Sequence, residues 1–290
     1  MTGNYVWAER NGKPGRLVPD REVTIALHDR GFWYGDGVFE TVRVWGGTLP
    51  LLPRHLQRLE AALAALGFPA LSVDWKQRSQ AVVQANQVSM GYLRLAVSRG
   101  EGPRGFLPPA DPQWLLLIEA GDWAPAVDYG REGMRAALAS WRVAPNSPLA
   151  HLKSLSGLDK VLAKQEATRL GVDEVLFVNT DGHLTEGASS SLFLVRGGRL
   201  CTPALDCGLL PGIARAVVLD LAGLSPQPFE TRLTPEAILE ADEAFLCNAL
   251  AGVIPLVEFA GQPIGGRSGP GPVTLALRRQ FEQVMAGRIY

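Results

Sequence analysis

Apolar positions recur along the chain with two periods, and each period predicts one kind of element. Apolar residues at helical spacing, together with flanking turn residues, predict helices at 54–67, 156–171, 212–223 and 272–287. Short apolar or alternating runs bounded by turn residues predict strands at 5–8, 16–18, 38–45, 92–98, 114–118, 134–137, 141–143, 174–178, 191–195, 199–202, 244–247 and 253–257. Because helices and strands are interspersed along the chain, the sequence predicts a mixed fold of the α/β (α+β) class.

Turn and capping residues mark the expected ends of these elements. Ser156 stands where the N-cap of a helix is expected, and Gly171 stands where that helix should end. Asn11-Gly12 is a strong signal for a two-residue hairpin turn. The segment 28–37 holds three glycines and two aspartates, which predicts a loop whose backbone approaches another group closely.

The length of the chain sets the number of domains that can be expected. With 290 residues the chain can bury one large core or two modest ones. The segment 121–126 carries a glycine, an aspartate and a proline between two predicted strands, as is typical of a linker. We therefore expect a small N-terminal α/β domain at 1–120 and a larger C-terminal cofactor-binding domain at 127–290.

Charge and composition exclude several classes of function. The chain has 28 basic and 29 acidic residues and no long basic tract, so no nucleic-acid partner is expected. Three cysteines and four scattered histidines lack the spacing of a disulfide framework or a zinc site, and no metal is expected. No apolar run approaches the ~18 residues of a membrane span, and the N-terminus lacks an apolar signal core. These patterns favour a soluble, cytoplasmic protein that acts on a small molecule.

One lysine is a candidate for covalent chemistry. Lys153 lies at the end of an irregular segment, among apolar residues, just before the predicted helix 156–171. Burial lowers the pKa of a lysine and exposes the lone pair that attacks an aldehyde, so Lys153 is a candidate Schiff-base amine. Taken alone, such a lysine is more often a surface charge, but the motifs that follow it favour the chemical interpretation. Lys160 and Lys164, four residues apart on the helix, are interpreted as a solvated pair.

Short motifs occur in a fixed order along the chain. Their sequences are D-R-G-F-W-Y-G-D-G-V-F-E at 29–40, R-H-L-Q-R-L at 54–59, Lys153, T-E-G at 185–187 and L-P-G-I-A-R at 210–215. This order and spacing resemble the class IV aminotransferases, the pyridoxal-phosphate enzymes of fold type IV. The resemblance extends from about residue 20 to about residue 280 and therefore covers most of the chain.

The resemblance implies an architecture, a cofactor and a partner. It implies a two-domain fold with a small α/β N-terminal domain and a larger pseudo-barrel C-terminal domain, assembled as a homodimer. It implies pyridoxal 5′-phosphate bound through Lys153, the catalytic residue, with Glu186 at the ring nitrogen. The expected phosphate-binding groups are the guanidinium of Arg58 and the backbone at Gly212, Ile213, Ala214, Ala249 and Leu250.

The expected substrate-binding residues separate the members of the family. The D-amino acid aminotransferases hold the substrate carboxylate with a tyrosine, an arginine and a histidine. The matching residues here are Phe32, Arg104 and Phe106, so that set of polar groups is incomplete. The branched-chain aminotransferases place a tyrosine five residues after the lysine, where this chain has Leu158. Neither pattern is therefore matched in full.

A late turn resembles another branch of the family. The sequence C-N-A-L-A-G-V-I-P at 247–255 is similar to the turn of the aminodeoxychorismate lyases, and Ala214 replaces a threonine in the same way. The resemblance implies that Arg104, Asn248 and Leu250 bind substrate carboxylates. We therefore expect a lyase that converts 4-amino-4-deoxychorismate to 4-aminobenzoate and pyruvate, in folate biosynthesis. Two alternatives stay open: an aminotransferase acting on D-amino or branched-chain amino acids, and a non-catalytic homologue that keeps only the fold.

Overall fold

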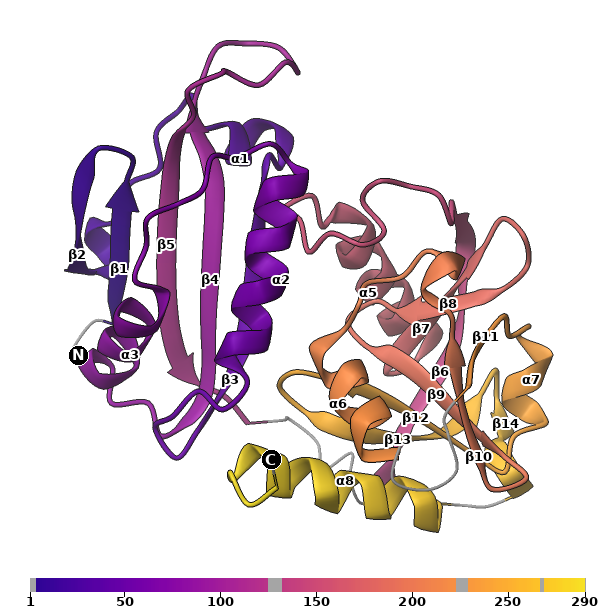
Figure 1. The fold of residues 1–290 in the computed structure, drawn as a ribbon. Coiled ribbons are helices and arrows are strands. Elements are labelled where there is room, and N and C mark those ends of the chain that lie inside the picture. Colours follow the sequence, from indigo (N-terminus) through magenta and orange to yellow (C-terminus); the bar gives the residue numbers. More distant parts are fainter. Residues whose placement is uncertain (1–3, 125–131, 223–228, 267–268, 290) are drawn as a thin grey trace. The chain divides into compact units, whose positions relative to one another are not determined.

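The computed structural model describes residues 4–124, 132–222, 229–266 and 269–289 (Figure 1). The chain forms two compact units. Unit 1 comprises Met1–Ala124 and Leu152–Gly157, and unit 2 comprises Pro125–His151 and Leu158–Tyr290. The segment around Lys153 thus belongs to the same unit as the N-terminal part of the chain. The predicted domain boundaries stay a prediction, since part of the predicted linker 121–126 lies outside the described residues.

Unit 1 is an antiparallel sheet with two helices on one face (Figure 1). Its strands are β1 (Tyr5–Arg10), β2 (Lys13–Pro19), β3 (Gly37–Trp45), β4 (Met90–Glu101) and β5 (Gln113–Asp122), paired in the order β2-β1-β5-β4-β3. Its helices are η1 (Asp20–Glu22), α1 (Arg30–Tyr34), α2 (Leu52–Ala65) and α3 (Trp75–Ala85). Leu59 of α2 and Val82 of α3 are buried in one core with Leu116 of β5, because all three lie on the apolar faces of their elements.

The segment 152–157 runs along the edge strand of this sheet. The Phe39 amide donates to the Lys153 carbonyl at 2.8 Å, and the Leu155 amide donates to the Gly37 carbonyl at 2.9 Å. These bonds flank an antiparallel bridge between Val38 and Ser154. The backbone of Lys153 is therefore fixed by β3 rather than by the helix that follows it.

Unit 2 is built around a closed ring of strands (Figure 1). The ring consists of β9 (Ser191–Arg196), β12 (Glu243–Asn248), β13 (Gly252–Phe259), β6 (Met134–Val143), β7 (Glu174–Asn179) and β8 (Leu184–Gly187), and it closes because β8 pairs with both β7 and β9. The strands β10 (Arg199–Pro203), β11 (Phe229–Thr231) and β14 (Gln262–Pro263) extend this sheet. Its helices are α5 (Leu158–Leu170), η2 (Leu205–Cys207), α6 (Ile213–Ala222), α7 (Glu236–Leu239), η3 (Ile264–Gly266) and α8 (Pro272–Met285). The predicted mixed α/β class and the pseudo-barrel are confirmed.

Three local predictions are wrong, each for a physical reason. The helix expected at 156–171 begins at Leu158, because the Ser156 hydroxyl points to the Tyr34 and Gly35 carbonyls, at 3.3 and 3.4 Å, and does not cap the helix. The T-E-G motif at 185–187, for which no strand is predicted, lies in the strand β8. The loop expected at 28–37 contains α1, which Asp29 caps by accepting a 2.7 Å bond from the Gly31 amide.

Among the residues that the structure describes, there is no membrane-spanning helix. None of the helices combines the length and the apolar character that crossing a bilayer requires.

Candidate active site

Lys153 is held beside β3 with its amine over an aromatic ring. Its Nζ lies 4.4 Å from the centroid of the Phe39 ring, close enough for a cation–π contact. Lys153 itself is half-buried. Because the backbone on either side is hydrogen-bonded to β3, the strand fixes the point from which the Lys153 side chain extends.

Arg58 forms a two-pronged ion pair with a buried glutamate. Arg58 Nε lies 2.8 Å from Glu40 Oε1, and Arg58 Nη2 lies 2.8 Å from Glu40 Oε2. Glu40 on β3 is 1% exposed, and the Arg58 side chain on α2 is 12% exposed. An arginine on such a helix is usually a solvated charge, but here it lies inside the unit. The planar guanidinium suits this fork-on-fork geometry.

His55 completes a buried triad with Glu40 and Arg58. His55 Nδ1 lies 2.7 Å from Glu40 Oε2. Burial tends to raise the pKa of Glu40, but hydrogen bonds from Arg58 and His55, and their charges, outweigh burial and lower that pKa to about 2. The pKa of His55 is lowered, and burial is the main cause. The hydrogen bond to Glu40 and the charge of Glu40 act in the opposite direction, whereas the charges of Arg58 and Lys153 lower this pKa further. An ionised Glu40 can only accept, so Nδ1 of the neutral ring carries the proton.

Arg30 anchors the loop that carries Arg104. Arg30 is 2% exposed, and its guanidinium donates to the Gly105 carbonyl at 2.7 Å and to the Phe106 carbonyl at 2.9 Å. Tyr34 adds a bond, because its hydroxyl oxygen accepts from the Gly105 amide at 3.0 Å. The loop between β4 and β5 is therefore tied to α1 at two successive residues. Sequence reasoning assigned no role to Arg30, although it lies in the motif at 29–40.

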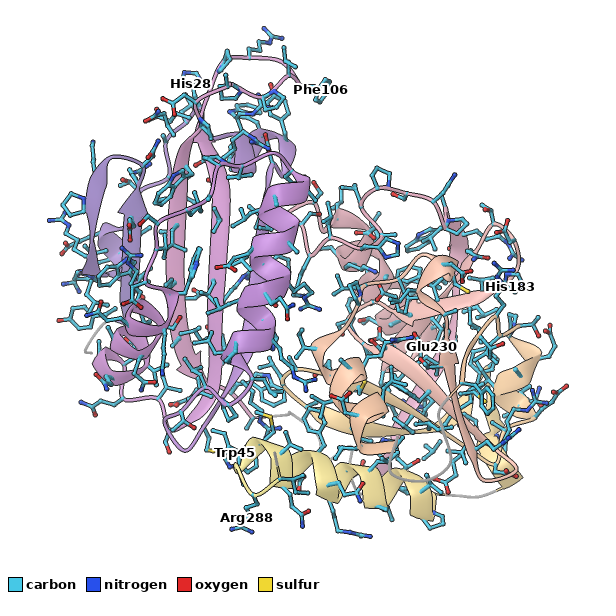
Figure 2. All side chains as sticks on the ribbon, in the orientation of Figure 1. His28, Trp45, Phe106, His183, Glu230 and Arg288 are labelled. Atoms are coloured by element: carbon cyan, nitrogen blue, oxygen red, sulfur yellow. The ribbon has the colours of Figure 1, made fainter. Side chains whose placement is uncertain are left out.

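The expected substrate residues of unit 1 are exposed. Arg104 is exposed, Phe32 is 68% exposed, and Phe106, near the tip of its loop, is 86% exposed (Figure 2). Phe106 touches Tyr34, with ring centroids 5.3 Å apart. The substrate-binding roles of Phe32 and Arg104 stay predictions.

In unit 2, Glu186 is paired with a lysine. Lys160 Nζ of α5 lies 2.9 Å from Glu186 Oε1 of β8, and the Leu210 amide donates to Glu186 Oε2 at 3.2 Å. The interpretation of Lys160 and Lys164 as a solvated pair is wrong, since Lys164 Nζ lies 3.0 Å from Glu174 Oε1. Each lysine thus faces a carboxylate of its own on the strands that α5 covers.

Glu174 shapes the turn that follows Glu186. Glu174, at the start of β7, is 1% exposed. Its carboxylate accepts from the Ala188 amide at 3.2 Å and from the hydroxyls of Ser189 and Ser190, each at 3.2 Å. From the sequence, Glu174 is predicted only as part of a strand. A lone acidic residue that opens an otherwise apolar strand is the signal that marks such a buried carboxylate.

The start of α6 offers backbone amides. Ala216 is the residue whose amide donates to the Gly212 carbonyl, at 2.9 Å, so the amides before it have no carbonyl partner within the helix. Together with the helix dipole, such amides favour an anion. A Cβ at Gly212 would lie 2.8 Å from Ser191 Oγ, so any larger residue there would force the Ser191 side chain or the turn to shift. Ile213 and Ala214, both buried, form the first turn.

The turn 248–251 is closed by its own side chain. Asn248 Oδ1 accepts from the Leu250 amide at 3.1 Å and from the Ala251 amide at 2.8 Å. The hydrogen of the Leu250 amide is therefore engaged by Asn248, which does not fit the expectation that this amide holds an anion. The roles expected for Asn248, Ala249 and Leu250 stay predictions.

The donors described in the two units match the chemistry of pyridoxal phosphate. The aldehyde needs an amine, the phosphate needs a cation and backbone amides, and the ring nitrogen needs a carboxylate. In unit 1, Lys153 carries an amine and Arg58 carries a guanidinium, and both charges act on His55. In unit 2, Glu186 carries a carboxylate and the first turn of α6 carries backbone amides, so the required kinds of group are present, and their roles toward the cofactor stay predictions. The residues present therefore fit the cofactor.

This fold and this set of residues define a family. The family model described as "Amino-transferase class IV" matches residues 37–259. The chain therefore belongs to the class IV aminotransferase family, and the resemblance noted in the sequence is confirmed.

Several relatives match nearly the whole chain. D-alanine aminotransferase of Bacillus licheniformis is 31% identical over 90% of this chain and 91% of its own. Aminodeoxychorismate lyase of Bacillus subtilis is 30% identical over 95% of this chain and 94% of its own. The structure of the Escherichia coli branched-chain amino acid aminotransferase superposes with a TM-score of 0.91 at 27% identity, covering 100% of this chain and 97% of its own.

A further solved structure bears on the cofactor. A second branched-chain amino acid aminotransferase, that of T.th., was solved with pyridoxamine 5′-phosphate. It matches 100% of this chain and 96% of its own at 26% identity, with a TM-score of 0.89. Pyridoxal 5′-phosphate, predicted from the sequence, is thus confirmed as the cofactor of the family to which the chain belongs.

Proposed function

We propose that this chain is a pyridoxal-phosphate-dependent aminotransferase that moves the amino group of an apolar amino acid to a 2-oxo acid. The likeness that carries this proposal covers 100% of the chain in the comparison with the E. coli branched-chain aminotransferase, so it is not confined to the cofactor motifs. The lyase expected from the sequence has weaker support, because the solved structure named as a putative 4-amino-4-deoxychorismate lyase of Legionella pneumophila gives a TM-score of 0.84 over 91% of this chain, against 0.91 over 100% for the aminotransferase. We therefore place the aminotransferase first.

The residues of the chain have separate roles in this proposal. When bound, pyridoxal phosphate supplies an electron sink for the charge that develops at the amine-bearing carbon of the substrate. Lys153 Nζ would take the proton from that carbon and deliver it to the carbon of the cofactor that receives the amino group. Glu186 binds the ring nitrogen, and Arg58, together with the first turn of α6, binds the phosphate.

The proposed substrate class rests on the residues that match the carboxylate-binding set of the D-amino acid aminotransferases. Arg104 is the cation for the substrate carboxylate in this proposal. Phe32 and Phe106 are apolar where the D-amino acid aminotransferases have polar groups, and they favour a substrate with an apolar side chain. Branched-chain amino acids have such side chains, and we place them ahead of D-alanine.

The half-reaction of the loaded protein tests this proposal. Purified protein with pyridoxal phosphate is mixed with L-leucine or D-alanine in the absence of any oxo acid, and the absorbance of the bound cofactor is followed. We expect L-leucine to convert the cofactor to its amine form with release of one equivalent of oxo acid. The Lys153→Ala variant should show neither the absorbance of covalently bound cofactor nor conversion. Wild-type conversion by Lys153→Ala would contradict the role of this lysine.

The lyase stays a second candidate because of one observation. Asn248 closes the turn 248–251 through two bonds to its Oδ1, and this turn has the sequence that resembles the aminodeoxychorismate lyases. Aminodeoxychorismate generated in situ tests it. Equal amounts of 4-aminobenzoate and pyruvate, formed without an added oxo acid, would favour the lyase over the aminotransferase. A non-catalytic homologue would give a colourless protein and neither reaction.

We also propose a homodimer, which the family resemblance implies. The exposed aromatic side chains of Phe32 and Trp33, 68% and 59% exposed, support a partner on that surface of unit 1. Sedimentation analysis should give twice the mass of the chain. A monomer at all concentrations would contradict the proposal.

A further inference from the structure

Lys160 places a positive charge directly on Glu186. The distance from Lys160 Nζ to Glu186 Oε1 is 2.9 Å, and Nζ also lies 4.5 Å from the centroid of the Phe177 ring. Phe177 is 1% exposed, so the ring is a fixed platform under the ammonium group. The side chains of Lys160 and Glu186 are 38% and 14% exposed, so the pair is only partly solvated.

The carboxylate of Glu186 is also fixed at its other oxygen. The Leu210 amide donates to Oε2, and Leu210 leads into the glycine turn before α6. A carboxylate accepts at about four lone-pair sites, so these two partners leave it able to accept a third donor. In the function proposed above, that third donor is the ring nitrogen of the cofactor, and this inference rests on that function.

Two cations that share one carboxylate weaken each other. Each withdraws negative charge that would otherwise stabilise the other, and the two positive charges also repel. We propose that Lys160 is a positioning residue that competes with the cofactor ring nitrogen for Glu186 and thereby limits protonation of the ring. Since a protonated ring is the stronger electron sink, Lys160 reduces the electron withdrawal that the cofactor supplies.

Lys164 provides a matched comparison on the same helix. It lies one turn further along α5, its side chain is 44% exposed, and its Nζ lies 3.0 Å from a carboxylate oxygen of Glu174. Lys164→Gln therefore removes the same charge from the same helix face at similar exposure. Only Lys160→Gln removes it from Glu186.

The test measures the ring nitrogen itself. Wild-type protein, Lys160→Gln and Lys164→Gln are loaded with pyridoxal phosphate labelled with ¹⁵N in the ring, and the ¹⁵N chemical shift of the bound cofactor is recorded at neutral pH. We expect the signal of Lys160→Gln to move upfield, toward the protonated ring, while Lys164→Gln keeps the wild-type position. We also expect the Kd for pyridoxal phosphate to fall about fivefold in Lys160→Gln, as loss of a competing, partly exposed ion pair predicts.

A measurement without cofactor tests the ion pair on its own. Thermal unfolding of the apoprotein in a cycle of Lys160→Gln, Glu186→Gln and the double variant should give a smaller loss in the double variant than the sum of the single losses. Identical ¹⁵N positions in all three loaded proteins, or additive losses in this cycle, would overturn the role of Lys160 and leave the proposed function intact. A wild-type protein that takes up no pyridoxal phosphate would overturn both.

Discussion

At the scale of single residues, both charges expected to bind the cofactor are neutralised by the chain itself. Arg58 forms an ion pair with Glu40, and Glu186 forms an ion pair with Lys160. Removing an ionised side chain from water is costly unless it has a partner of opposite charge. These ion pairs therefore allow Arg58 and Glu186 to stay ionised in the folded protein before the cofactor binds. The Glu40 carboxylate accepts hydrogen bonds from Nε and Nη2 of Arg58, and these two bonds set the plane and direction of the guanidinium.

Glu40→Gln should destabilise unit 1 in a pH-dependent way. The variant leaves Arg58 and His55 facing a neutral group, and we expect a loss of about 2–3 kcal/mol at pH 7 in urea unfolding. The pKa of Glu40 is lowered from 4.5 to about 2, so its contribution is complete above pH 4.5 and is lost as the pH falls toward 2. The lowered pKa of His55 also makes stability fall as the pH falls below 6.5, because His55 in the unfolded chain binds a proton at a higher pH than in the folded chain.

The stability of wild-type protein should therefore decline between pH 6.5 and 2, and the part of that decline below pH 4.5 should be smaller in Glu40→Gln. Parallel curves for the two proteins below pH 4.5 would contradict the assignment of this titration to Glu40.

At the scale of elements, α1 controls the loop between β4 and β5. Arg30→Lys keeps a positive charge but loses the fork that binds two successive carbonyls of the loop. We expect faster hydrogen exchange at residues 104–107 and about a tenfold higher KM for the amino acid, with an unchanged spectrum of the bound cofactor.

Arg99→Lys is the matched control for this prediction. Arg99 is also buried and also pairs with Asp36, but its Nη2 donates to the Leu66 carbonyl and not to the loop. Equal hydrogen exchange at residues 104–107 and equal KM in the two variants would show that the effect comes from the lost ion pair with Asp36 and not from the lost bonds to the loop carbonyls.

The turn before α6 should not tolerate a side chain. Gly212→Ala places a Cβ 2.8 Å from Ser191 Oγ and should push the first turn of α6 away from β9. We expect about tenfold weaker binding of pyridoxal phosphate, from an overpacking cost of ~1–3 kcal/mol. Adding Ser191→Ala should restore part of the affinity, because it removes the atom that clashes.

Gly269→Ala is the control for Gly212→Ala, since a Cβ there meets no atom within 4 Å. If Gly212→Ala binds the cofactor as tightly as Gly269→Ala does, the close packing at this turn has no bearing on cofactor binding.

At the scale of the whole molecule, periodicity and motifs predicted most elements but not their tertiary partners. Strand patterns and hairpin turns predicted β1, β2 and β3, because these signals are local. The four-residue strand β8 was missed because a run of that length shows no clear period. Local pattern also could not place the segment 152–157 beside β3, since such a bridge depends on the path of the whole chain.

For the candidate site, the sequence predicted the functional residues but not the residues that form ion pairs with them. The motifs identified Lys153, Arg58 and Glu186 as candidates from their order along the chain. They could not reveal Glu40 and Lys160 as partners, because each ion pair joins elements that are distant in sequence and meet only in the folded unit. The lyase-like turn at 247–255 and the likeness of the whole chain to aminotransferases favour different functions, because a short motif reports on one turn only, whereas the whole-chain likeness includes every element of the fold.

Transfer of a labelled amino group tests the proposed function most directly. The loaded protein is incubated with ¹⁵N-labelled L-leucine and an unlabelled 2-oxo acid of different mass, and the products are identified by mass spectrometry. The aminotransferase predicts ¹⁵N in the new amino acid, an equal amount of the oxo acid from leucine, and no transfer by Lys153→Ala. Absence of transfer from every amino acid tried, while aminodeoxychorismate yields 4-aminobenzoate and pyruvate in equal amounts, would contradict it.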